Sequence, residues 1–456
     1  MLTKSSLADV IYATLKNWQN VESPIVAVGD LLLVGQEQAQ GQQDLRQALN
    51  RVVLNGLAVV EKQNEVGGHI LRKRFVEGDD MISEVALRLR LSEDQVKRRQ
   101  REALNSLVEV IWGWEATARQ HWVQAEQAAL APAGHDHLIG LEAVHDELVR
   151  LLVAPAGPWL VALIGIGGIG KTSLANMAAH TVIDRFAFQR VVWLRINGIQ
   201  DRPGNGEELL LYLADHPALA IPAGTPPQRL QTLRQTLKAI PHLIILDNLE
   251  AENQVNLLAD SLPALTNPSK FLLTSRVRLP AGTTIHNITL QELSPAESLT
   301  LIRNQAQTIG LTELAQASET DLTTIYQHLG GNPLALKLVV GLATILPLPQ
   351  ILADLLTVQT QEIEQMYRHI YWRAWHSLSD EAQLVLEMMP MIAGIGARPE
   401  QIAAITGLEP AQLWPIISQL VNRSLLEVHG TTWERRYAIH RLTESFLKTE
   451  IIHWPH

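Results

Sequence analysis

The sequence of 456 residues contains no cysteine. Disulfide bonds, thiolate zinc sites and cysteine nucleophiles are therefore excluded. The sequence also lacks an unbroken apolar run of about 18 residues, the length needed to cross a bilayer. Its first 18 residues follow an amphipathic helical pattern and lack the continuous apolar segment of a signal peptide. We therefore expect a cytoplasmic protein that has no membrane partner.

Charged residues are sparse, at 18% of the chain, whereas hydrophobic residues make up 46%. A chain of this length and composition can bury the cores of roughly two to four domains. The formal net charge is −10, yet residues 1–125 are nearly neutral, with 15 basic and 16 acidic side chains. The bases of this segment gather late, at Arg72, Lys73, Arg74, Arg88 and Arg90 and in the stretch 97–101. The acidic total therefore does not exclude a local site for an anionic partner.

The N-terminal segment 1–76 combines helical patterns with two short apolar runs that flank a pair of glycines. The runs Val59–Glu61 and Ile70–Phe75 are predicted as strands, with Gly67–Gly68 as the turn between them. Helices followed by such a hairpin are typical of a winged helix. We therefore predict a small winged-helix-like module over residues 1–76.

Residues 77–117 contain two helical patterns that are separated at Leu91–Ser92. Apolar side chains that share one face of a helix are Ile82, Val85, Ala86 and Leu89 in the first pattern and Val96, Leu104, Leu107 and Val108 in the second. Ser92 and Gln95 have the spacing of a capping box at the start of the second helix. Two helices joined by so short a turn predict a helix-turn-helix-like segment.

The start of this second helix is strongly basic, which is typical of a helix that contacts DNA. In this interpretation the side chains that face DNA are Gln95, Lys97, Arg98, Arg99 and Arg101. The alternative is a helical module for protein contacts or oligomerisation, in which these bases are solvated or pair with Glu93, Asp94 and Glu102. The segment resembles the fourth region of sigma factors, a signature that is degenerate. The residues leave both alternatives open.

The rest of the chain changes its pattern three times. An Ala/Gln-rich stretch ending in Pro-Ala-Gly predicts a linker over 118–135. Residues 136–288 alternate short apolar runs with helical patterns, as the buried parallel strands of an α/β domain do. Residues 289–365 are predicted to be helical, and Ser294, Pro295 and Glu297 there mark a helix start.

The last segment, 366–456, has the pattern of a second winged helix. The predicted elements are helices at Ser379–Met389, Pro399–Ile405 and Ala411–Val421, strands at 424–428 and 436–440, and a final helix. The expected fold class is thus a multidomain α/β plus α protein.

The strongest motif is LIGIGGIGKTS, which contains Gly165-x-x-x-x-Gly170-Lys171-Thr172 between a predicted strand and a predicted helix. Glycines let backbone N–H groups surround phosphate oxygens, and the helix N-terminus adds its dipole. Lys171 is expected to reach the β- and γ-phosphates of ATP, and the Thr172 hydroxyl to bind Mg²⁺. The predicted ATP or ADP site comprises Gly165, Gly167, Gly168, Gly170, Lys171, Thr172 and Ser173.

Two later strands end in residues that suit the same site. In HLIILDNLE, Asp247 ends an apolar run, where a carboxylate can hold Mg²⁺. Asn248 and Glu250 can each orient a water molecule, but only Glu250 can accept its proton. In FLLTSR, Arg276 ends a third strand and either reaches the γ-phosphate or forms a surface ion pair. We predict Lys171, Asp247 and Arg276 as catalytic residues, and Thr172 and Asp247 as metal ligands.

These motifs and four others occur in the order and approximate spacing of the NB-ARC type of STAND signalling ATPases. The resemblance rests on GIGGIGKTSLA, LIILDNLE, FLLTSR, HLGGNPLALKLV, DHLIGLEAVHDELVRLL, ELSPAESLTLI and YAIHRL, and it covers about residues 136–456. That family includes plant resistance proteins, the apoptosome ATPase and many bacterial regulators. The resemblance implies a P-loop domain with a parallel sheet, a helical domain and a winged-helix domain.

The resemblance also implies roles for single residues. The backbone near Ile139 would contact adenine, and Pro333 would pack on it. Arg276 would sense the γ-phosphate. His440, which would otherwise be expected in a core, would bind the β-phosphate of ADP and hold a closed state.

Two positions depart from the family pattern. Asn248 stands where a second acid is usual, which predicts slow hydrolysis. Arg441 stands where an aspartate often follows the histidine, which predicts that the contact holding the closed state differs from that of the family. Family members often carry sensor repeats after the winged helix, whereas only residues 441–456 follow His440. We therefore expect either a separate sensor or effector protein as a partner, or a shortened chain.

Together these features predict a switch that is controlled by ATP and ADP. Exchange of ADP for ATP would release the His440 contact and permit the chain to form a homo-oligomer. The N-terminal segment would be the output module, acting on duplex DNA in transcription regulation or in defence signalling. Two alternatives remain, a constitutive P-loop ATPase that remodels a DNA or protein partner and a nucleotide-bound scaffold that does not hydrolyse ATP.

Overall fold

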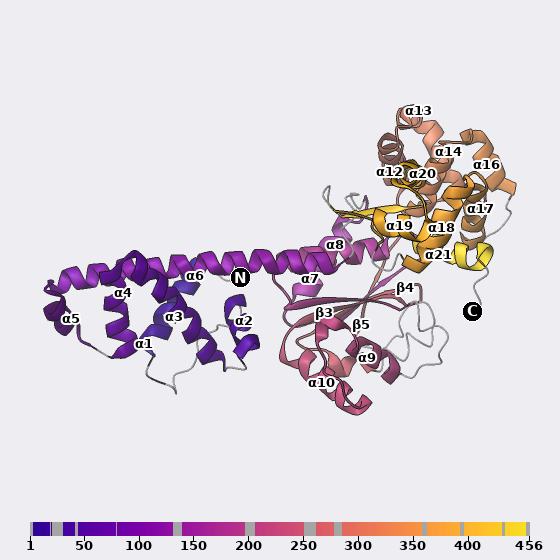
Figure 1. The fold of residues 1–456 in the computed structure, drawn as a ribbon. Helices are drawn as coiled ribbons and strands as arrows, with labels where there is room; N and C mark the ends of the chain where they lie inside the picture. The colour runs from indigo at the N-terminus through magenta and orange to yellow at the C-terminus, as the bar shows by residue number, and fades with distance from the viewer. Residues whose placement is uncertain are drawn as a thin grey trace. The chain divides into compact units, whose positions relative to one another are not determined.

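A computed structural model describes most of the chain. The described residues are 3–18, 20, 31–41, 44–78, 80–130, 139–196, 206–249, 261–277, 285–357, 363–392, 396–430 and 434–452. The chain divides into two compact units, Met1–Ala125 and Glu126–His456 (Figure 1). Each unit has its own buried core.

The first unit is built from helices throughout its described residues (Figure 1). Their bounds are α1 Lys4–Lys16, α2 Leu32–Gly41, α3 Leu45–Gln63, α4 Glu65–Leu71, the π-helix η1 Arg72–Glu77, α5 Ile82–Leu89 and α6 Glu93–Ala129. Leu7 of α1, Leu57 of α3 and Leu107 of α6 are fully buried in its main core. Asp44 caps α3, because its carboxylate accepts the N–H of Gln47 at 2.7 Å.

The hairpin predicted for this unit is wrong, because Val59–Glu61 and Ile70–Phe75 both lie in helices. The glycine pair is not a hairpin turn either. Asn64 Oδ1 accepts the N–H of Gly67 at 2.9 Å and caps α4, and a Cβ on Gly68 would lie 2.8 Å from the Cα of Glu61. The glycines therefore allow α4 to approach α3 closely. Without strands, the winged-helix-like module predicted for residues 1–76 is not formed.

The two helices predicted after this segment are confirmed as α5 and α6. Arg90, at a φ of 53°, ends α5, and Ser92 and Gln95 form the predicted capping box at the start of α6. A small core between these helices and α4 contains Ile70, Val85, Ala86 and Val96. The apolar periodicity thus identified both helices and their inward faces.

Helix α6 is 37 residues long and continues to Ala129, so the prediction of a linker that begins at residue 118 is wrong. Alanine and glutamine, which are frequent over 118–129, are good helix formers and need no loop conformation. Residues 131–135, the remainder of the predicted linker, and 136–138, the start of the predicted P-loop domain, lie outside the described residues. The two units divide after Ala125, so the last turn of α6 belongs to the second unit.

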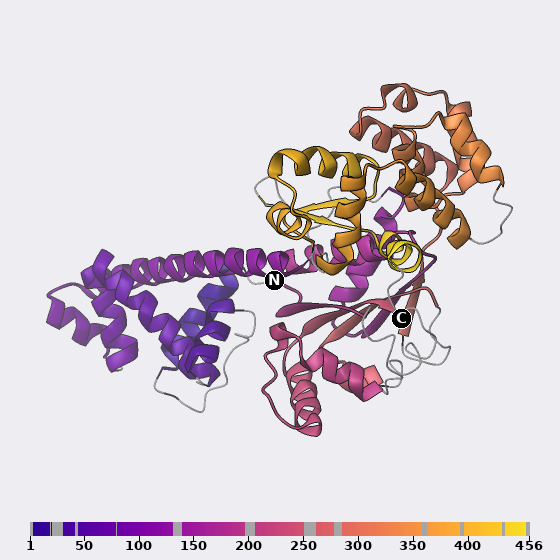
Figure 2. The ribbon, with the colours of Figure 1, turned by 45° about the vertical axis from the view of Figure 1, so that its right-hand side comes forward.

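The second unit begins with a five-stranded parallel sheet in the order β2-β3-β4-β1-β5 (Figure 2). The strands are β1 Leu160–Ile164, β2 Arg190–Arg195, β3 His242–Leu249, β4 Lys270–Ser275 and β5 Ile285–Thr289. The residues of β1 and β4 are all buried, and so are most residues of β3 and half of those of β2, as in a sheet that is covered on both faces. This part of the fold is the P-loop NTPase-like sheet that the sequence predicted.

Helices lie on both faces of this sheet (Figures 1 and 2). Their bounds are α7 Glu142–Val153, α8 Lys171–Asp184, α9 Gly206–Ala214, α10 Pro226–Ala239, and the short 3-10 helices η2 Pro217–Leu219 and η3 Leu262–Leu265. Leu160, Ala162 and Ile164 of β1 face the core that includes α9 and α10. Helix α8 contacts β1, β3 and β4 and packs against α7.

The remainder of the second unit is helical, apart from a two-stranded antiparallel sheet that precedes its last two helices. Its elements are α12 Pro295–Thr308, α13 Thr312–Ala315, α14 Glu319–Leu329, α15 Pro333–Leu342, α16 Leu348–Thr357, α17 Ile363–His376, α18 Asp380–Ile392, α19 Pro399–Thr406, α20 Pro410–Asn422, β6 Glu427–Gly430, β7 Arg435–Ala438, α21 Arg441–Phe446 and the π-helix η4 Leu447–Ile451. One continuous hydrophobic core runs from α12 to η4.

The three helices predicted over 379–421 are confirmed as α18, α19 and α20, but the first strand starts later than predicted. The N–H groups of Leu425 and Leu426 donate to the carbonyl of Leu420, at 3.0 and 3.2 Å. Ser424 has a φ of 57°. These residues therefore close the end of α20, and β6 begins only at Glu427.

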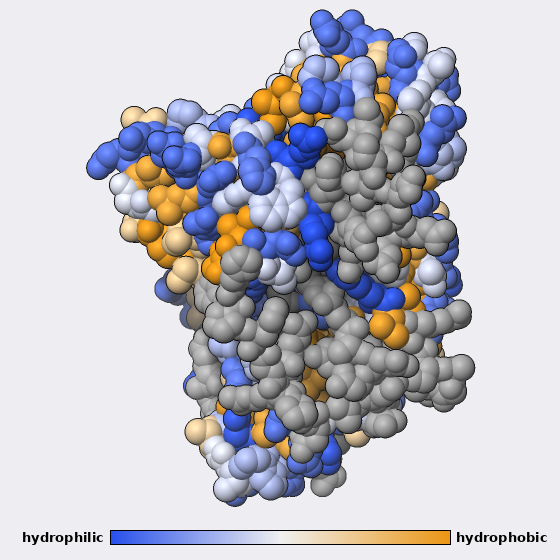
Figure 3. All heavy atoms as spheres, turned by 90° about the vertical axis from the view of Figure 1, so that its right-hand side faces the viewer, coloured by the Kyte–Doolittle hydropathy of each residue, from blue (hydrophilic) through white to orange (hydrophobic). Residues whose placement is uncertain are grey.

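The described helices include none that is both long and apolar enough to cross a membrane. Figure 3 shows one face of the molecule, on which the described hydrophobic side chains form small groups among hydrophilic ones. Such a mixed surface is ordinary for a folded domain.

Candidate nucleotide-binding site

The glycine-rich loop lies between β1 and α8, at the carboxyl end of the central sheet. Gly168 and Gly170 have φ angles of 75° and 103°, which favour glycine, and Gly170 is the residue before the first turn of α8. A Cβ on Gly165 would lie 3.0 Å from Ile169 Cγ2 and 3.3 Å from the carbonyl oxygen of Leu290. The loop therefore needs its glycines both for conformation and for space.

Lys171 is the first residue of α8, and its side chain turns back over the loop. Its Nζ donates to the carbonyl oxygens of Gly165 and Ile166, at 2.8 and 2.9 Å. These contacts place a permanent positive charge beside the N-terminus of a 14-residue helix. That position favours an anion, because the helix dipole and the free N–H groups of the first turn add to the charge of the ammonium.

Asp247 lies near the end of β3 and is only 4% exposed. Its Oδ1 accepts from the hydroxyls of Thr172, at 2.9 Å, and Thr274, at 2.6 Å. The Thr274 oxygen in turn accepts the N–H of Asn248 at 2.8 Å. Asn248 has a φ of 83°, a conformation that asparagine tolerates better than most residues. The P-loop helix, β3 and β4 are thus joined through one carboxylate.

This donor set fits Mg²⁺. A threonine hydroxyl that donates its proton to Asp247 keeps its lone pairs for a cation, and a carboxylate and a hydroxyl oxygen are hard ligands of the kind that Mg²⁺ prefers. Thr172 and Asp247 would hold the ion, whose charge would offset that of phosphate oxygens.

Two arginines lie at the carboxyl ends of neighbouring strands. Arg195 ends β2, and its Nε lies 3.9 Å from Asp247 Oδ2. Arg276 follows β4, where its N–H donates to the carbonyl oxygen of Leu249 at 3.4 Å. Both side chains line the pocket that the P-loop, Asp247 and Thr274 also line. Arg276 was predicted for this place and Arg195 was not.

The opposite side of this pocket is formed by the C-terminal hairpin and the helix that follows it. The lining residues from this part of the chain are Glu427, Ile439, His440 and Glu444. His440 immediately precedes α21, and its carbonyl oxygen accepts the N–H of Glu444 at 2.9 Å. His440 and Lys171 therefore line one pocket although 269 positions of sequence separate them.

The predicted adenine-side residues, Ile139 and Pro333, are not among these lining residues. Pro333 is the first residue of α15, and Asn332 before it donates to the carbonyl oxygen of Gly167 at 2.9 Å. Ile139 packs against the core of the helical part. The structure thus ties the P-loop to α15 through Asn332, which the sequence analysis did not single out.

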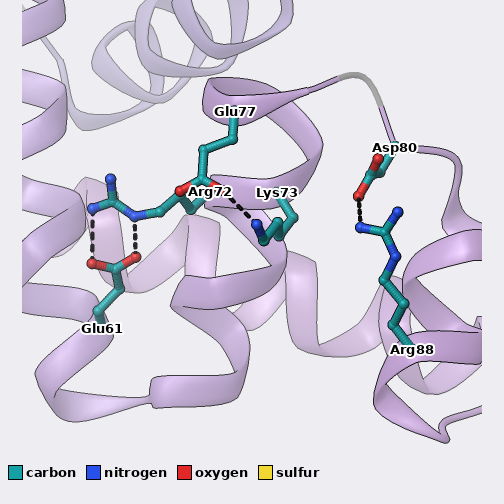
Figure 4. Close-up of polar contacts among 6 residues, drawn as sticks. All are labelled: Glu61, Arg72, Lys73, Glu77, Asp80 and Arg88. Carbon is teal, nitrogen blue, oxygen red and sulfur yellow. Dashed lines mark hydrogen bonds and ion pairs between the residues drawn. The ribbon is translucent and has the colours of Figure 1, made fainter.

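The basic residues of the first unit are largely engaged with neighbouring carboxylates. Figure 4 shows Arg72 paired with Glu61, Lys73 with Glu77, and Arg88 with Asp80. The pKa of Arg72 is raised by its hydrogen bond to Glu61. This surface is therefore less positive than the count of its bases indicates.

The same holds for the basic start of α6. Arg98 Nε lies 2.9 Å from Glu102 Oε1, a contact that raises the pKa of Arg98. Lys97 lies 3.8 Å from Asp94, and Gln95 uses its side-chain oxygen in the capping box. Arg98 and Arg101 are exposed, and Arg99 is half-buried. All five predicted residues lie on this helix, and their binding role stays a prediction.

The residues that the sequence analysis missed lie at the ends of elements. Arg195 closes the apolar run RVVWLR at the same point where Asp247 closes its own strand. A polar residue at a strand end was therefore a usable signal. Glu427 and Glu444 had no such signal, because only the folded chain brings the hairpin to the P-loop.

Comparison with known proteins now adds to the geometry. Residues 141–310 match the family model of the NB-ARC domain. Residues 141–310 thus carry an NB-ARC domain. The match includes the P-loop, Asp247 and Arg276, and it ends within the helical part.

Two relatives show what this chain is similar to. The disease resistance protein RPP8 of Arabidopsis thaliana is 28% identical over 214 residues, which are 45% of this chain and 23% of that protein. The regulatory protein AfsR of Streptomyces griseus is 30% identical over 218 residues, 46% of this chain and 21% of that protein. The chain thus spans about a quarter of the length of the curated relatives that it matches.

Among solved structures, this chain is similar to a STAND protein with a tetratricopeptide repeat sensor from Pyrococcus horikoshii. The sequence identity is 18%, the TM-score is 0.43, and the likeness covers 70% of this chain and 43% of that one. Cdc6p from Pyrobaculum aerophilum is 14% identical with a TM-score of 0.34, over 69% of this chain and 96% of that one.

Proposed function

We propose that this protein is a signalling switch that is controlled by ATP and ADP. One observation carries the proposal, namely that His440, near the C-terminus, and the P-loop line one pocket. A ligand in that pocket contacts both the sheet and the C-terminal hairpin. Its identity can therefore bias how the two are held together.

In this proposal each residue of the pocket has a defined task. Lys171 binds the β- and γ-phosphates, Thr172 and Asp247 hold Mg²⁺, and Arg276 meets the γ-phosphate. His440 binds the β-phosphate of ADP and holds the closed state. Ile139 and Pro333 would form the adenine side.

The proposal assigns parts of the second unit to separate domains. Residues 136–288 form the P-loop domain, 289–365 the helical domain and 366–456 the winged-helix domain. The continuous core from α12 to η4 supports joint movement of the last two relative to the sheet. Exchange of ADP for ATP would then open the contact at His440 and permit a homo-oligomer.

Hydrolysis, where it occurs, would reset the switch. Asn248 cannot take a proton from water, which favours slow turnover. A fast constitutive ATPase and a scaffold that never hydrolyses remain the competing functions.

The deciding measurement is the particle mass, by light scattering after size exclusion, with ADP and with a non-hydrolysable ATP analogue. We expect a larger particle with the analogue only. His440→Ala should form that particle with ADP also, because the ADP-specific contact is lost. A mass that never responds to nucleotide contradicts the switch. Rapid steady hydrolysis by the monomer favours the constitutive ATPase, and absence of any hydrolysis favours the scaffold.

We further propose duplex DNA as the output partner of the first unit, bound by the start of α6. The helix pair α5 and α6, joined by the three residues 90–92, favours this output. The ion pairs of Arg98 and Lys97 favour the competing output, a protein-contact module.

Charge reversal separates the two outputs. Arg98→Glu with Arg99→Glu should abolish a salt-sensitive DNA interaction, because the contacts would be electrostatic. ATP binding should be unchanged in the same variant. DNA binding that survives the reversal, or that is absent from the unmodified protein with either nucleotide, would favour the protein-contact module.

A further inference from the structure

Arg195 is held beside Asp247 by the sheet itself. Arg195 of β2 and Asp247 of β3 are direct partners in the parallel register. Neighbouring residues in register project to the same face of a sheet. Strand pairing therefore places the two side chains side by side on one face, and Arg195 Nε lies 3.9 Å from Asp247 Oδ2.

The two oxygens of Asp247 have different surroundings. Oδ1 accepts from the hydroxyls of Thr172 and Thr274, whereas Oδ2 faces Arg195. The carboxylate is almost fully buried, so its charge is poorly screened by water. Arginine is always protonated, and Arg195 therefore supplies a fixed positive charge at Oδ2.

The pocket as a whole has balanced charges. Its lining includes three cations, Lys171, Arg195 and Arg276, and three carboxylates, Asp247, Glu427 and Glu444. Loss of one cation would leave an excess of carboxylates facing a phosphate ligand. The balance thus makes Arg195 important for binding an anion that arrives without a metal ion.

We propose that Arg195 is a positioning residue that takes the place of Mg²⁺ at Asp247 when ADP is bound without metal. The proposal rests on the proposed function, because it presumes ADP in this pocket. Arg195 neutralises a carboxylate that would otherwise repel the β-phosphate. It also competes with a metal ion for that carboxylate, so it weakens metal retention. ADP affinity is consequently almost independent of Mg²⁺.

The test is ADP affinity by isothermal titration calorimetry, in Mg²⁺ and in EDTA. The intact protein should bind ADP with similar affinity in both. Arg195→Gln should lose about tenfold or more in EDTA, while its affinity in Mg²⁺ should change by less than about threefold. Arg195→Lys, which keeps the charge, should retain metal-free binding.

A matched control is Arg234→Gln, which removes an exposed arginine of α10 outside the pocket. It should behave as the intact protein in both conditions. A second measurement titrates Mg²⁺ into the ADP complex, and Arg195→Gln should bind the metal more tightly because its competitor is gone. A thermal melt of each nucleotide-free variant verifies that it folds.

Four results would overturn the proposal. An equal loss of affinity with and without Mg²⁺ in Arg195→Gln would assign Arg195 to direct phosphate binding or to folding. Unchanged affinities would make it a bystander. Tight ADP binding by the intact protein that disappears in EDTA would also contradict it, while leaving the proposed function standing. Failure of the intact protein to bind ADP in either condition would contradict both.

Discussion

The two units use their basic side chains in different ways. In the second unit Lys171, Arg195 and Arg276 come from a helix and two strands and converge on one pocket. In the first unit Arg72 and Arg98 each pair with a carboxylate at hydrogen-bond distance. Convergence of a few cations from separate elements is therefore a better indicator of an anion site than the density of bases along the sequence.

The difference has a geometric cause. Parallel strands all end at one edge of the sheet, so residues far apart in sequence meet there. A helix spreads successive side chains around its axis and along its length, and it pairs residues four positions apart. Arg98 and Glu102 have this spacing, so pairing was available within α6 itself.

The largest effect is expected on nucleotide affinity when Lys171 is replaced. Lys171→Met should lower the affinity for ATP and ADP by about 100-fold, because it removes a charged hydrogen-bond donor from the phosphate site. Arg98→Gln, which removes a base of the first unit, should leave nucleotide affinity unchanged. Calorimetric titration of both variants measures the contrast. Equal losses would show that the two sets of bases are not functionally distinct.

The next largest effect is expected on stability, at the point where α4 approaches α3 closely in the first unit. Gly68→Ala should lower the free energy of unfolding by about 2 kcal/mol, because the new Cβ would lie 2.5 Å from Glu61 Cγ and 2.8 Å from its Cα. Gly113 of α6 has no atom within 4 Å of such a Cβ, so Gly113→Ala should stabilise by about 0.5–1 kcal/mol. Urea unfolding compares the two. Equal changes in the free energy of unfolding for the two variants would contradict the close approach of α4 to α3 at Gly68.

Replacement of Glu126, in the last turn of α6, should lower the stability of the second unit moderately. Its carboxylate is 5% exposed and accepts from Arg190 Nη1 at 2.6 Å and from the N–H of Val191 at 2.9 Å. Glu126→Ala leaves the N–H at the start of the edge strand without this acceptor, at a cost of about 1–2 kcal/mol. Glu109→Ala, on the same helix, removes an exposed ion pair with Lys4 and should cost less than about 0.5 kcal/mol.

These two glutamate variants are compared by urea unfolding of the whole chain. A larger loss for Glu109→Ala than for Glu126→Ala would contradict the anchoring role of Glu126. Both glutamates belong to α6, so the comparison isolates the effect of a buried acceptor from that of an exposed ion pair on one helix.

The smallest effect concerns Lys270, a cation of the second unit that lies outside the lining of the pocket and donates to backbone carbonyl groups. Its Nζ donates to the carbonyl oxygens of Leu151 and Ala154, at 2.7 and 2.6 Å, near the end of α7. Burial lowers the pKa of Lys270 to about 8. The unfolded chain, with a lysine pKa near about 10.4, binds more protons between these two values.

The free energy of unfolding should therefore rise as the pH increases through this window. The two carbonyl acceptors favour the charged form, so we expect a gain of only about 1 kcal/mol between pH 7.5 and pH 9.5. Lys270→Met has no group that titrates there and should lack this gain. Urea unfolding at both pH values measures the difference. An equal change in the free energy of unfolding between the two pH values, in the intact protein and in Lys270→Met, would contradict the lowered pKa of Lys270.

Two pairs of glycines differ in how well the sequence predicts their structure. In the P-loop, Gly168 and Gly170 stand between a predicted strand and a predicted helix, and both adopt positive φ angles. Gly67 and Gly68 stand between apolar runs that were read as strands, yet they lie inside α4. Alternating apolar residues at 57–75 suit either a strand or a packed helix. Only the contacts of the glycines with Glu61 and Ala103 decide between them.

The residues that line the pocket also divide into those that the sequence predicts and those that it does not. Lys171, Thr172, Asp247 and Arg276 follow from motifs whose spacing along the chain is informative. Arg195 has only a weak signal, its place at a strand end. Glu427 and Glu444 have none, because their distance from Lys171 depends on how the helical part folds back over the sheet.

By itself the sequence determined the P-loop, the parallel sheet and the helices α5, α18, α19 and α20, since these depend on local periodicity and on short motifs. It also determined the capping box at the start of α6, which joins residues three positions apart. Only the tertiary structure decided that the first unit is helical, that Arg195 lies at Asp247, and that His440 shares a pocket with Lys171. The physical reason is that these features depend on contacts between segments whose spacing in the chain carries no information about their distance in space.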